Sequence, residues 1–217
     1  MSEKLLCPSL MCADFGKLAD EVRVLDEAGV DIFHCDIMDG TFVPNFTMGV
    51  ADVKAVRAAT DKLVDCHLMI ENPANKVDWF MDAGADIIYI HPESERYVVK
   101  TLAHIRERGK KAGLAINPDT PLSAVEEMLN PCDYVMVMTV NPGFAGQKFI
   151  PFTIGKIKQL AALKETYGFK LMIDGACSPE VIRDCSRLGV DGFVLGTSAL
   201  FGKGRPFSEI LQELREL

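Results

Sequence analysis

Short apolar runs alternate along this chain with longer segments in which apolar residues recur every three or four positions. The short runs are typical of buried strands, and the longer periodicity is typical of amphipathic helices. We expect eight strands, near 5–10, 32–38, 63–69, 87–91, 112–116, 134–140, 170–174 and 192–195. Helical patterns lie between them, for example at 16–28, 76–83, 98–108, 122–128, 154–166, 179–188 and from 206 onward.

The junctions between helix and strand repeat one pattern. Ala-Gly-Val-Asp at 28–31, Ala-Gly-Ala-Asp at 83–86 and Leu-Gly-Val-Asp at 188–191 each stand directly before an apolar strand. Glycine suits the end of a helix because it tolerates positive φ. Alternating βα units without a linker, and without the GxGxxG motif of an open dinucleotide-binding sheet, predict an α/β protein that is a single (β/α)8 TIM barrel over residues 1–217.

Composition narrows the possible partners. The chain has 217 residues, 48% of them hydrophobic, and a net charge of −8 with no basic block, which argues against nucleic acid and anionic membranes. It shows no apolar leader and no apolar run as long as a membrane span. The seven cysteines are odd in number and lack CxxC spacing. We therefore expect reduced thiols in a cytoplasmic protein, and we also expect a homo-oligomer.

Polar side chains interrupt the second, third and seventh predicted strands. The second carries His34 and Asp36 on one face, the third carries Asp65 and His67 on one face, and the seventh ends with Asp174. Burying such charge costs several kcal/mol unless a metal or a catalytic role compensates for it. Active sites of barrels lie at the carboxyl ends of strands, so His34, Asp36, His67 and Asp174 could bind a divalent metal. A purely structural polar cluster is the alternative.

Glycine-containing loops follow the last three predicted strands. They read NPGFAGQ at 141–147, DGACSPE at 174–180 and Gly-Thr-Ser at 196–198, and Ser178 and Pro179 suit the N-cap and first position of a helix. Barrels often bind phosphate in these loops, through convergent backbone N–H groups. NPG by itself is more often an ordinary turn, but three such loops in succession favour a phosphate site.

Six motifs, in order and spread over nearly the whole chain, resemble the ribulose-phosphate 3-epimerase family. They are PSLMCADF at 8–15, HCDIMDGTFVPN at 34–45, DCHLM at 65–69, MTVNPGFAGQKFIP at 138–151, IDG at 173–175 and GTS at 196–198. The resemblance implies an isomerase that inverts C3 of a ketose phosphate. It also implies one divalent metal ion, which His34, Asp36, His67 and Asp174 would bind. Zinc is the expected metal, and manganese, cobalt and iron(II) are the alternatives.

The same resemblance assigns roles to individual residues. Asp36 and Asp174 would be the two acid/base groups, which exchange a proton with C3 on opposite faces of an enediolate. Substrate contacts would come from Ser9 and His67, from three methionines beside the reacting carbon, and from backbone around the phosphate. The methionines are Met38, Met69 and Met138, and the phosphate-binding residues are Gly143, Phe144, Ala145, Gly146, Gly175, Ala176, Gly196 and Thr197.

Several positions depart from the commonest pattern of this family. Met11 and Cys12 follow Ser9 and Leu10, and Ala176 stands where a second glycine is usual. With GTSALF at 196–201, these residues look more like the branch that acts on D-allulose 6-phosphate, which we favour over D-ribulose 5-phosphate of the pentose phosphate pathway. Because alanine disfavours positive φ, a differently set phosphate loop is also expected.

Two other functions remain as alternatives. A phosphate-binding decarboxylase or aldolase barrel would share the phosphate loops but usually needs a lysine near a strand end, whereas Lys4, Lys111 and Lys170 lie near predicted strand starts. A non-catalytic sugar-phosphate binder would not need two carboxylates in a metal site. Two further residues are interpreted as structural, Asp39 in a turn before Gly40 and Met136 in the core.

Overall fold

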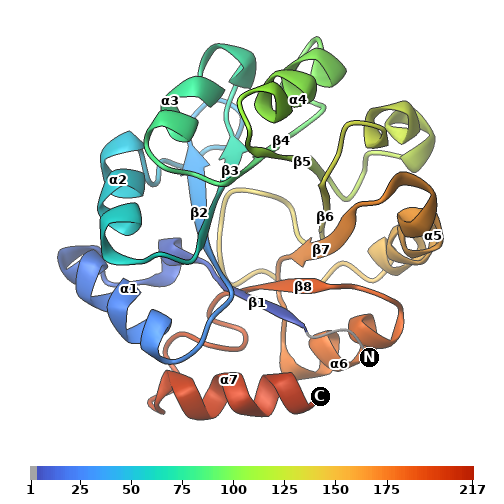
Figure 1. The fold of residues 1–217 in the computed structure, drawn as a ribbon. Coiled ribbons are helices and arrows are strands. Elements are labelled where there is room, and N and C mark those ends of the chain that lie inside the picture. Colours follow the sequence, from blue (N-terminus) through green and yellow to red (C-terminus); the bar gives the residue numbers. More distant parts are fainter. Residues whose placement is uncertain (1–3) are drawn as a thin grey trace.

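The computed structural model describes residues 4–217, and it confirms the predicted barrel (Figure 1). These residues form a parallel sheet of eight strands in the order β1-β8-β7-β6-β5-β4-β3-β2. A parallel bridge between Ser9 and His34 joins β1 to β2 and so closes the sheet. The strands are β1 Leu5–Pro8, β2 Ile32–Met38, β3 Leu63–Met69, β4 Ile87–Ile90, β5 Lys111–Ile116, β6 Tyr134–Met138, β7 Lys170–Asp174 and β8 Gly192–Leu195.

Helices surround the sheet in Figure 1, and their bounds agree with most of the predicted ones. They are α1 Leu18–Glu27, α2 Val50–Ala59, α3 Val77–Asp82, α4 Val98–Glu107, α5 Thr153–Tyr167, α6 Pro179–Arg187 and α7 Phe207–Glu216. Helix α2 was not among the predicted helices, although Asp52 in its first turn accepts from the Gly49 N–H, which is a helix start signal. None of the helices in residues 4–217 is long and apolar enough to cross a membrane.

The predicted helix at 122–128 is wrong. The structure has two 3₁₀ turns there, Leu122–Ala124 and Glu126–Leu129, separated by Val125 at φ −126° and ψ −1°. The segment lies between Pro121 and Pro131. Packing of the buried Val125 then competes with helical geometry in a segment this short.

Alternation along the strands separates two cores. Phe33, Cys35 and Ile37 of β2 face the helices and belong to the large outer core, whereas Ile32 belongs to the core inside the barrel. The inner core also contains Tyr89, Met136 and Met172, among other apolar side chains, so Met136 is core as expected. Apolar side chains thus fill the barrel interior, while polar side chains occupy its carboxyl end.

The three repeated Gly-x-Asp junctions fasten the opposite end of the barrel. Gly29, Gly84 and Gly189 all have positive φ, of 90°, 108° and 96°, as predicted. The carboxylate of the aspartate two residues later accepts a hydrogen bond from the backbone N–H of a neighbouring strand. These contacts are Asp31 with Leu6 at 2.8 Å, Asp86 with Val64 at 3.1 Å and Asp191 with Leu171 at 2.7 Å. Each junction therefore links the start of one strand to the strand that precedes it in the chain.

Candidate active site

Two strands deliver the centre of the site. His34 and Asp36 lie on the inward face of β2, and His67 lies on the inward face of the adjacent β3. Oδ1 of Asp36 is 3.2 Å from Nε2 of His34 and 3.3 Å from Nδ1 of His67. The Ser9 hydroxyl donates to Oδ2 of Asp36 at 2.5 Å. One buried carboxylate therefore contacts two imidazoles and a hydroxyl, because successive inward positions on paired strands meet at this end of the barrel.

Asp174, the last residue of β7, completes the cluster. Its Oδ2 lies 3.6 Å from Nδ1 of His67. Thr139 fixes the backbone at this point, because its N–H and hydroxyl both donate to the Asp174 carbonyl, at 2.7 and 2.9 Å. Within residues 4–217, one donor atom from each of His34, Asp36, His67 and Asp174 lies within 4.8 Å of the other three. This mixture of imidazole and carboxylate donors suits a divalent transition metal.

Asp65 lies behind His34 in the barrel interior. Its Oδ1 is 2.6 Å from Nδ1 of His34, and both side chains are fully buried. A carboxylate at this nitrogen holds the ring proton on Nδ1 and leaves the lone pair of Nε2 facing Asp36. That tautomer is the one a metal ligand needs.

Burial and mutual charge shift the acid–base properties of the metal-free cluster. Burial raises the pKa of Asp36, but His34 and His67 outweigh it and hold that pKa well below its ordinary value. Burial and then the Asp36 charge raise the pKa of Asp174 to about 6. Burial lowers the pKa of His34, but the charges of Asp65 and Asp36 raise it well above its usual range. The raised pKa of His34 and the lowered pKa of Asp36 describe an ion pair, in which a bound divalent cation would take the place of the His34 proton.

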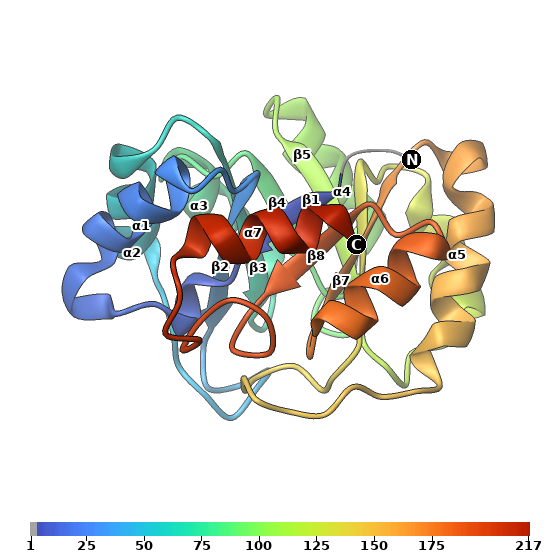
Figure 2. The ribbon, with the colours of Figure 1, turned by 90° about the horizontal axis from the view of Figure 1, so that it is seen from below.

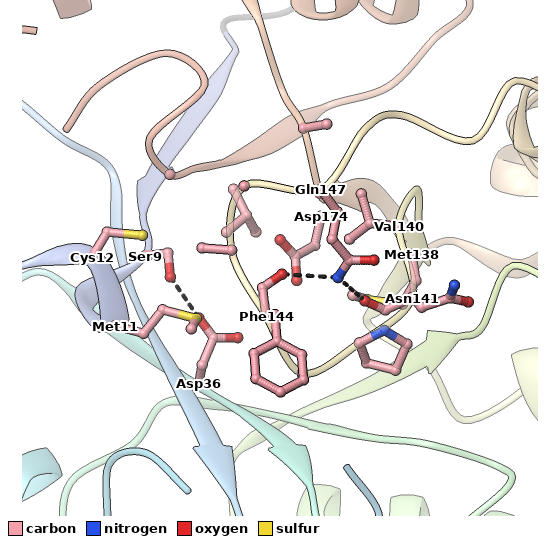
Figure 3. A pocket seen from close by; sticks show the side chains of 18 of the residues that line it. Ser9, Met11, Cys12, Asp36, Met138, Val140, Asn141, Phe144, Gln147 and Asp174 are labelled. Carbon is pink, nitrogen blue, oxygen red and sulfur yellow. Dashed lines mark hydrogen bonds between the residues drawn. The ribbon is translucent and has the colours of Figure 1, made fainter. Parts of the chain in front are cut away.

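A pocket opens over this cluster (Figure 3). Figure 3 shows Asp36 and Asp174 among the side chains that line it. The pocket contains every predicted substrate-binding residue except His67, which is fully buried beneath it and does not line it. The lining residues are Ser9, Met11, Cys12, Asp36, Met38, Met69, Met138, Val140, Asn141, Pro142, Gly143, Phe144, Ala145, Gly146, Gln147, Asp174, Gly175, Ala176, Val194, Gly196, Thr197 and Ser198.

The loop at 141–147 crosses the mouth of the barrel, as the yellow segment of Figure 1 shows. Side chains tie down its carbonyl groups: the Gln147 amide donates to Asn141 at 2.6 Å and to Phe144 at 2.9 Å, and the Asn45 amide donates to Gly143 at 2.8 Å. Asn45 belongs to the loop after β2, and Figure 2 shows that loop and the 141–147 loop at the same edge of the barrel. Two separate loops therefore form one wall of the pocket.

Two successive residues of the loop after β7 have positive φ, the conformation that glycine adopts most easily. Gly175 has a φ of 114°, and Ala176 also adopts positive φ, at 50°. Alanine therefore occupies the left-handed region here in spite of its Cβ, at a cost of roughly 1–2 kcal/mol. Ser178 caps α6 through the Val181 N–H at 3.3 Å, and Pro179 is its first residue, as predicted.

The chain matches the Ribulose-phosphate 3 epimerase family over residues 5–201. It is 43% identical to a ribulose-phosphate 3-epimerase of Synechocystis sp. over 91% of this chain and 87% of that protein. It is 38% identical to a ribulose-phosphate 3-epimerase of Escherichia coli (strain K12) over 99% of this chain and 96% of that one. The chain belongs to the ribulose-phosphate 3-epimerase family. It is therefore an isomerase of the epimerase class, and the family acts on small phosphosugars.

Solved structures with other activities share the fold of this epimerase. A 3-keto-L-gulonate-6-phosphate decarboxylase from Vibrio cholerae has a TM-score of 0.73 at 17% identity, with 99% of this chain and 98% of that chain covered. A 3-hexulose-6-phosphate synthase has a TM-score of 0.66 at 18% identity, with 97% and 98% covered. At such low identity the likeness shows the barrel alone.

Sequence reasoning missed residues that other elements bring to the site. Met11 and Cys12, which the sequence marked only as departures from the family pattern, line the pocket of the epimerase directly after Ser9. Behind His67 lie His91, just past the end of β4, and Glu93. His91 was visible at the end of a predicted strand, but nothing in the sequence indicated that it would contact His67.

Asp39 is structural, as the sequence indicated. Its carboxylate accepts from the N–H groups of Thr41 at 2.9 Å, Phe42 at 3.1 Å and Glu71 at 2.9 Å, so it joins the loop after β2 to the end of β3. Burial raises the pKa of Asp39, but these three hydrogen bonds outweigh it and lower the pKa below its ordinary value. The carboxylate therefore stabilises the fold when it is ionised.

Replacing Asp39 by alanine should lower the free energy of unfolding by about 2 kcal/mol at neutral pH, because three hydrogen bonds to a charged group are lost. A depressed pKa contributes stability above the unfolded value of about 3.9, and this contribution disappears as the pH falls through the folded value. Urea unfolding of both proteins at pH 7 and at lower pH should show the difference shrinking on acidification. Equal stability at pH 7 would contradict the structural role.

Proposed function

We propose that this epimerase inverts C3 of a ketose phosphate with two carboxylate bases and a bound divalent cation. The observation that carries the proposal is the convergence of Asp36 and Asp174, from strands on different sides of the barrel, on one pocket that glycine-containing loops also line. A non-catalytic binder has no need for two carboxylates on a metal cluster.

The donor set fits a metal. His34 would bind through Nε2 and His67 through Nδ1, the ring nitrogens that face Asp36, and Asp36 and Asp174 would each supply a carboxylate oxygen. When bound there, a divalent cation supplies Lewis acidity that stabilises the negative charge formed on deprotonation beside a ketone. We propose zinc, with manganese, cobalt or iron(II) as alternatives.

The two aspartates would move the protons. One carboxylate removes the C3 proton from one face of the substrate, and the other returns a proton to the opposite face, which inverts the configuration. Ser9 donates to Oδ2 of Asp36 and so orients that carboxylate. Met38, Met69 and Met138 line the same pocket and would keep water away from the enediolate. The loops at 143–146, 175–176 and 196–197 would hold the phosphate.

The substrate pair we propose is D-allulose 6-phosphate and D-fructose 6-phosphate. Met11, Cys12 and Ala176, which depart from the commonest family pattern, all line the pocket, where they can affect specificity. Cys12 also reaches the last phosphate loop, since its Sγ is 3.6 Å from where a Cβ on Gly196 would lie. D-ribulose 5-phosphate is the second candidate, because relatives at 38% to 43% identity carry the name ribulose-phosphate 3-epimerase.

Epimerisation in D₂O should place deuterium at C3 of the product in nearly every first turnover, because the proton taken by one aspartate is not the one delivered by the other. Mass spectrometry or NMR of the product would measure it. Replacing Asp36 or Asp174 by asparagine should lower kcat by several orders of magnitude, on the order of 10³-fold or more, since a base and a metal ligand are lost together. Asp39→Asn is the matched control and should retain activity. Product that keeps its original C3 hydrogen would refute the two-base proposal.

Prolonged chelation should abolish turnover, and added zinc, manganese, cobalt or iron(II) should restore it. Elemental analysis should find about one metal ion per chain in the wild type and a loss of metal in His67→Ala. His104→Ala is the control, because His104 lies on the exposed face of α4 and pairs with Asp78 at 3.0 Å. Full activity in a preparation free of metal would exclude the metal requirement.

Side-by-side kcat/KM values should rank D-allulose 6-phosphate above D-ribulose 5-phosphate, and free D-allulose far below both. The phosphate is remote from C3, so its binding energy would be used to position the reacting carbon. A higher value for D-ribulose 5-phosphate would assign the second candidate instead. Comparable efficiency with D-allulose and its 6-phosphate would remove the proposed role of the glycine-containing loops.

A further inference from the structure

His67 has a second buried imidazole behind it. Its Nε2 lies 2.8 Å from Nε2 of His91, and both rings are fully buried. Two ring nitrogens at this distance share one proton, so one ring donates and the other accepts. The Phe42 ring packs against the His91 ring, with centroids 4.9 Å apart. The pair is thus held in place, and only the position of the proton remains to be decided.

Glu93 stands at the far side of His91. Its Oε2 is 3.4 Å from Nδ1 of His91, within ion-pair distance, and this Nδ1 makes no hydrogen bond within residues 4–217. Its other oxygen, Oε1, accepts from the Thr120 hydroxyl and lies 3.4 Å from the Asn117 N–H. The loop after β5 therefore fixes one carboxylate oxygen of Glu93 and leaves the second facing the imidazole.

These contacts decide which ring donates. A carboxylate oxygen is only an acceptor, so Glu93 favours the His91 tautomer with its proton on Nδ1. Nε2 of His91 must then accept the proton of His67 Nε2. The lone pair of His67 Nδ1 is consequently directed at Asp36 and Asp174, which lie 3.3 and 3.6 Å away. In the reverse arrangement His67 would present an N–H to the metal position.

We propose that His91 and Glu93 are positioning residues, which place the ring proton of His67 so that its Nδ1 can bind the metal. Neither residue lines the substrate pocket. The ring proton of His34 is placed by direct contact with the Asp65 carboxylate. The carboxylate that supports His67 is that of Glu93, and the His91 ring stands between them. The inference rests on the proposed metal site.

Glu93→Gln distinguishes this role from a merely structural one. Its amide oxygen should face the Asn117 N–H, so its NH₂ group would donate to Nδ1 of His91 and reverse the chain of protons. We expect the Zn²⁺ dissociation constant, measured by competition with a chelating indicator, to rise about 10- to 100-fold. Ring ¹⁵N NMR shifts should place the His91 proton on Nδ1 in the wild type and on Nε2 in the variant.

Glu95→Gln is the matched control, because Glu95 lies two residues further on and its carboxylate accepts from the Ala74 and Tyr97 N–H groups at 2.9 Å. It should bind Zn²⁺ like the wild type. Wild-type Zn²⁺ affinity in Glu93→Gln, or a wild-type His91 proton on Nε2, would overturn the proposal and leave the metal site intact. A wild type that binds no Zn²⁺ would instead overturn the metal site, and this inference with it.

Discussion

The Asp36 carboxylate is the group on which the rest of this site depends. It lies almost fully buried at the carboxyl end of the barrel interior, where an unpaired charge would cost several kcal/mol. Contacts with His34, His67 and Ser9 compensate for it, and those residues come from three adjacent strands or strand ends. The same contacts leave donor atoms facing one another across a space that a divalent cation can fill.

The aspartates at the two ends of the barrel have different roles. At the amino end of the strands, the carboxylates of Asp31, Asp86 and Asp191 bind backbone N–H groups and tie the strands together. At the carboxyl end, the carboxylates of Asp36 and Asp174 accept from no backbone N–H of residues 4–217, and both line the pocket. The apolar interior between the ends keeps the strands in fixed register, so residues far apart in the sequence meet with little freedom.

Local pattern predicted the strands well because buried strands give short apolar runs with a strict two-residue alternation. It failed around Val125, where a short segment between two prolines has too few residues for periodicity to decide its conformation. Because alanine disfavours positive φ, a differently set loop was expected after β7, whereas Ala176 adopts a φ of 50° there. In both places tertiary packing outweighed local preference.

The sequence by itself determined the barrel, the inward face of each strand and the four residues of a cluster that could hold a metal, because alternation and the succession of βα units follow from local pattern. It placed Asp65 on the face of His67 but could not show that its carboxylate would contact His34 on the neighbouring strand. Only the tertiary structure decided that contact, and likewise the contact between His67 and His91. Both depend on the register between strands, which side-chain packing sets across the whole barrel and which no local stretch encodes.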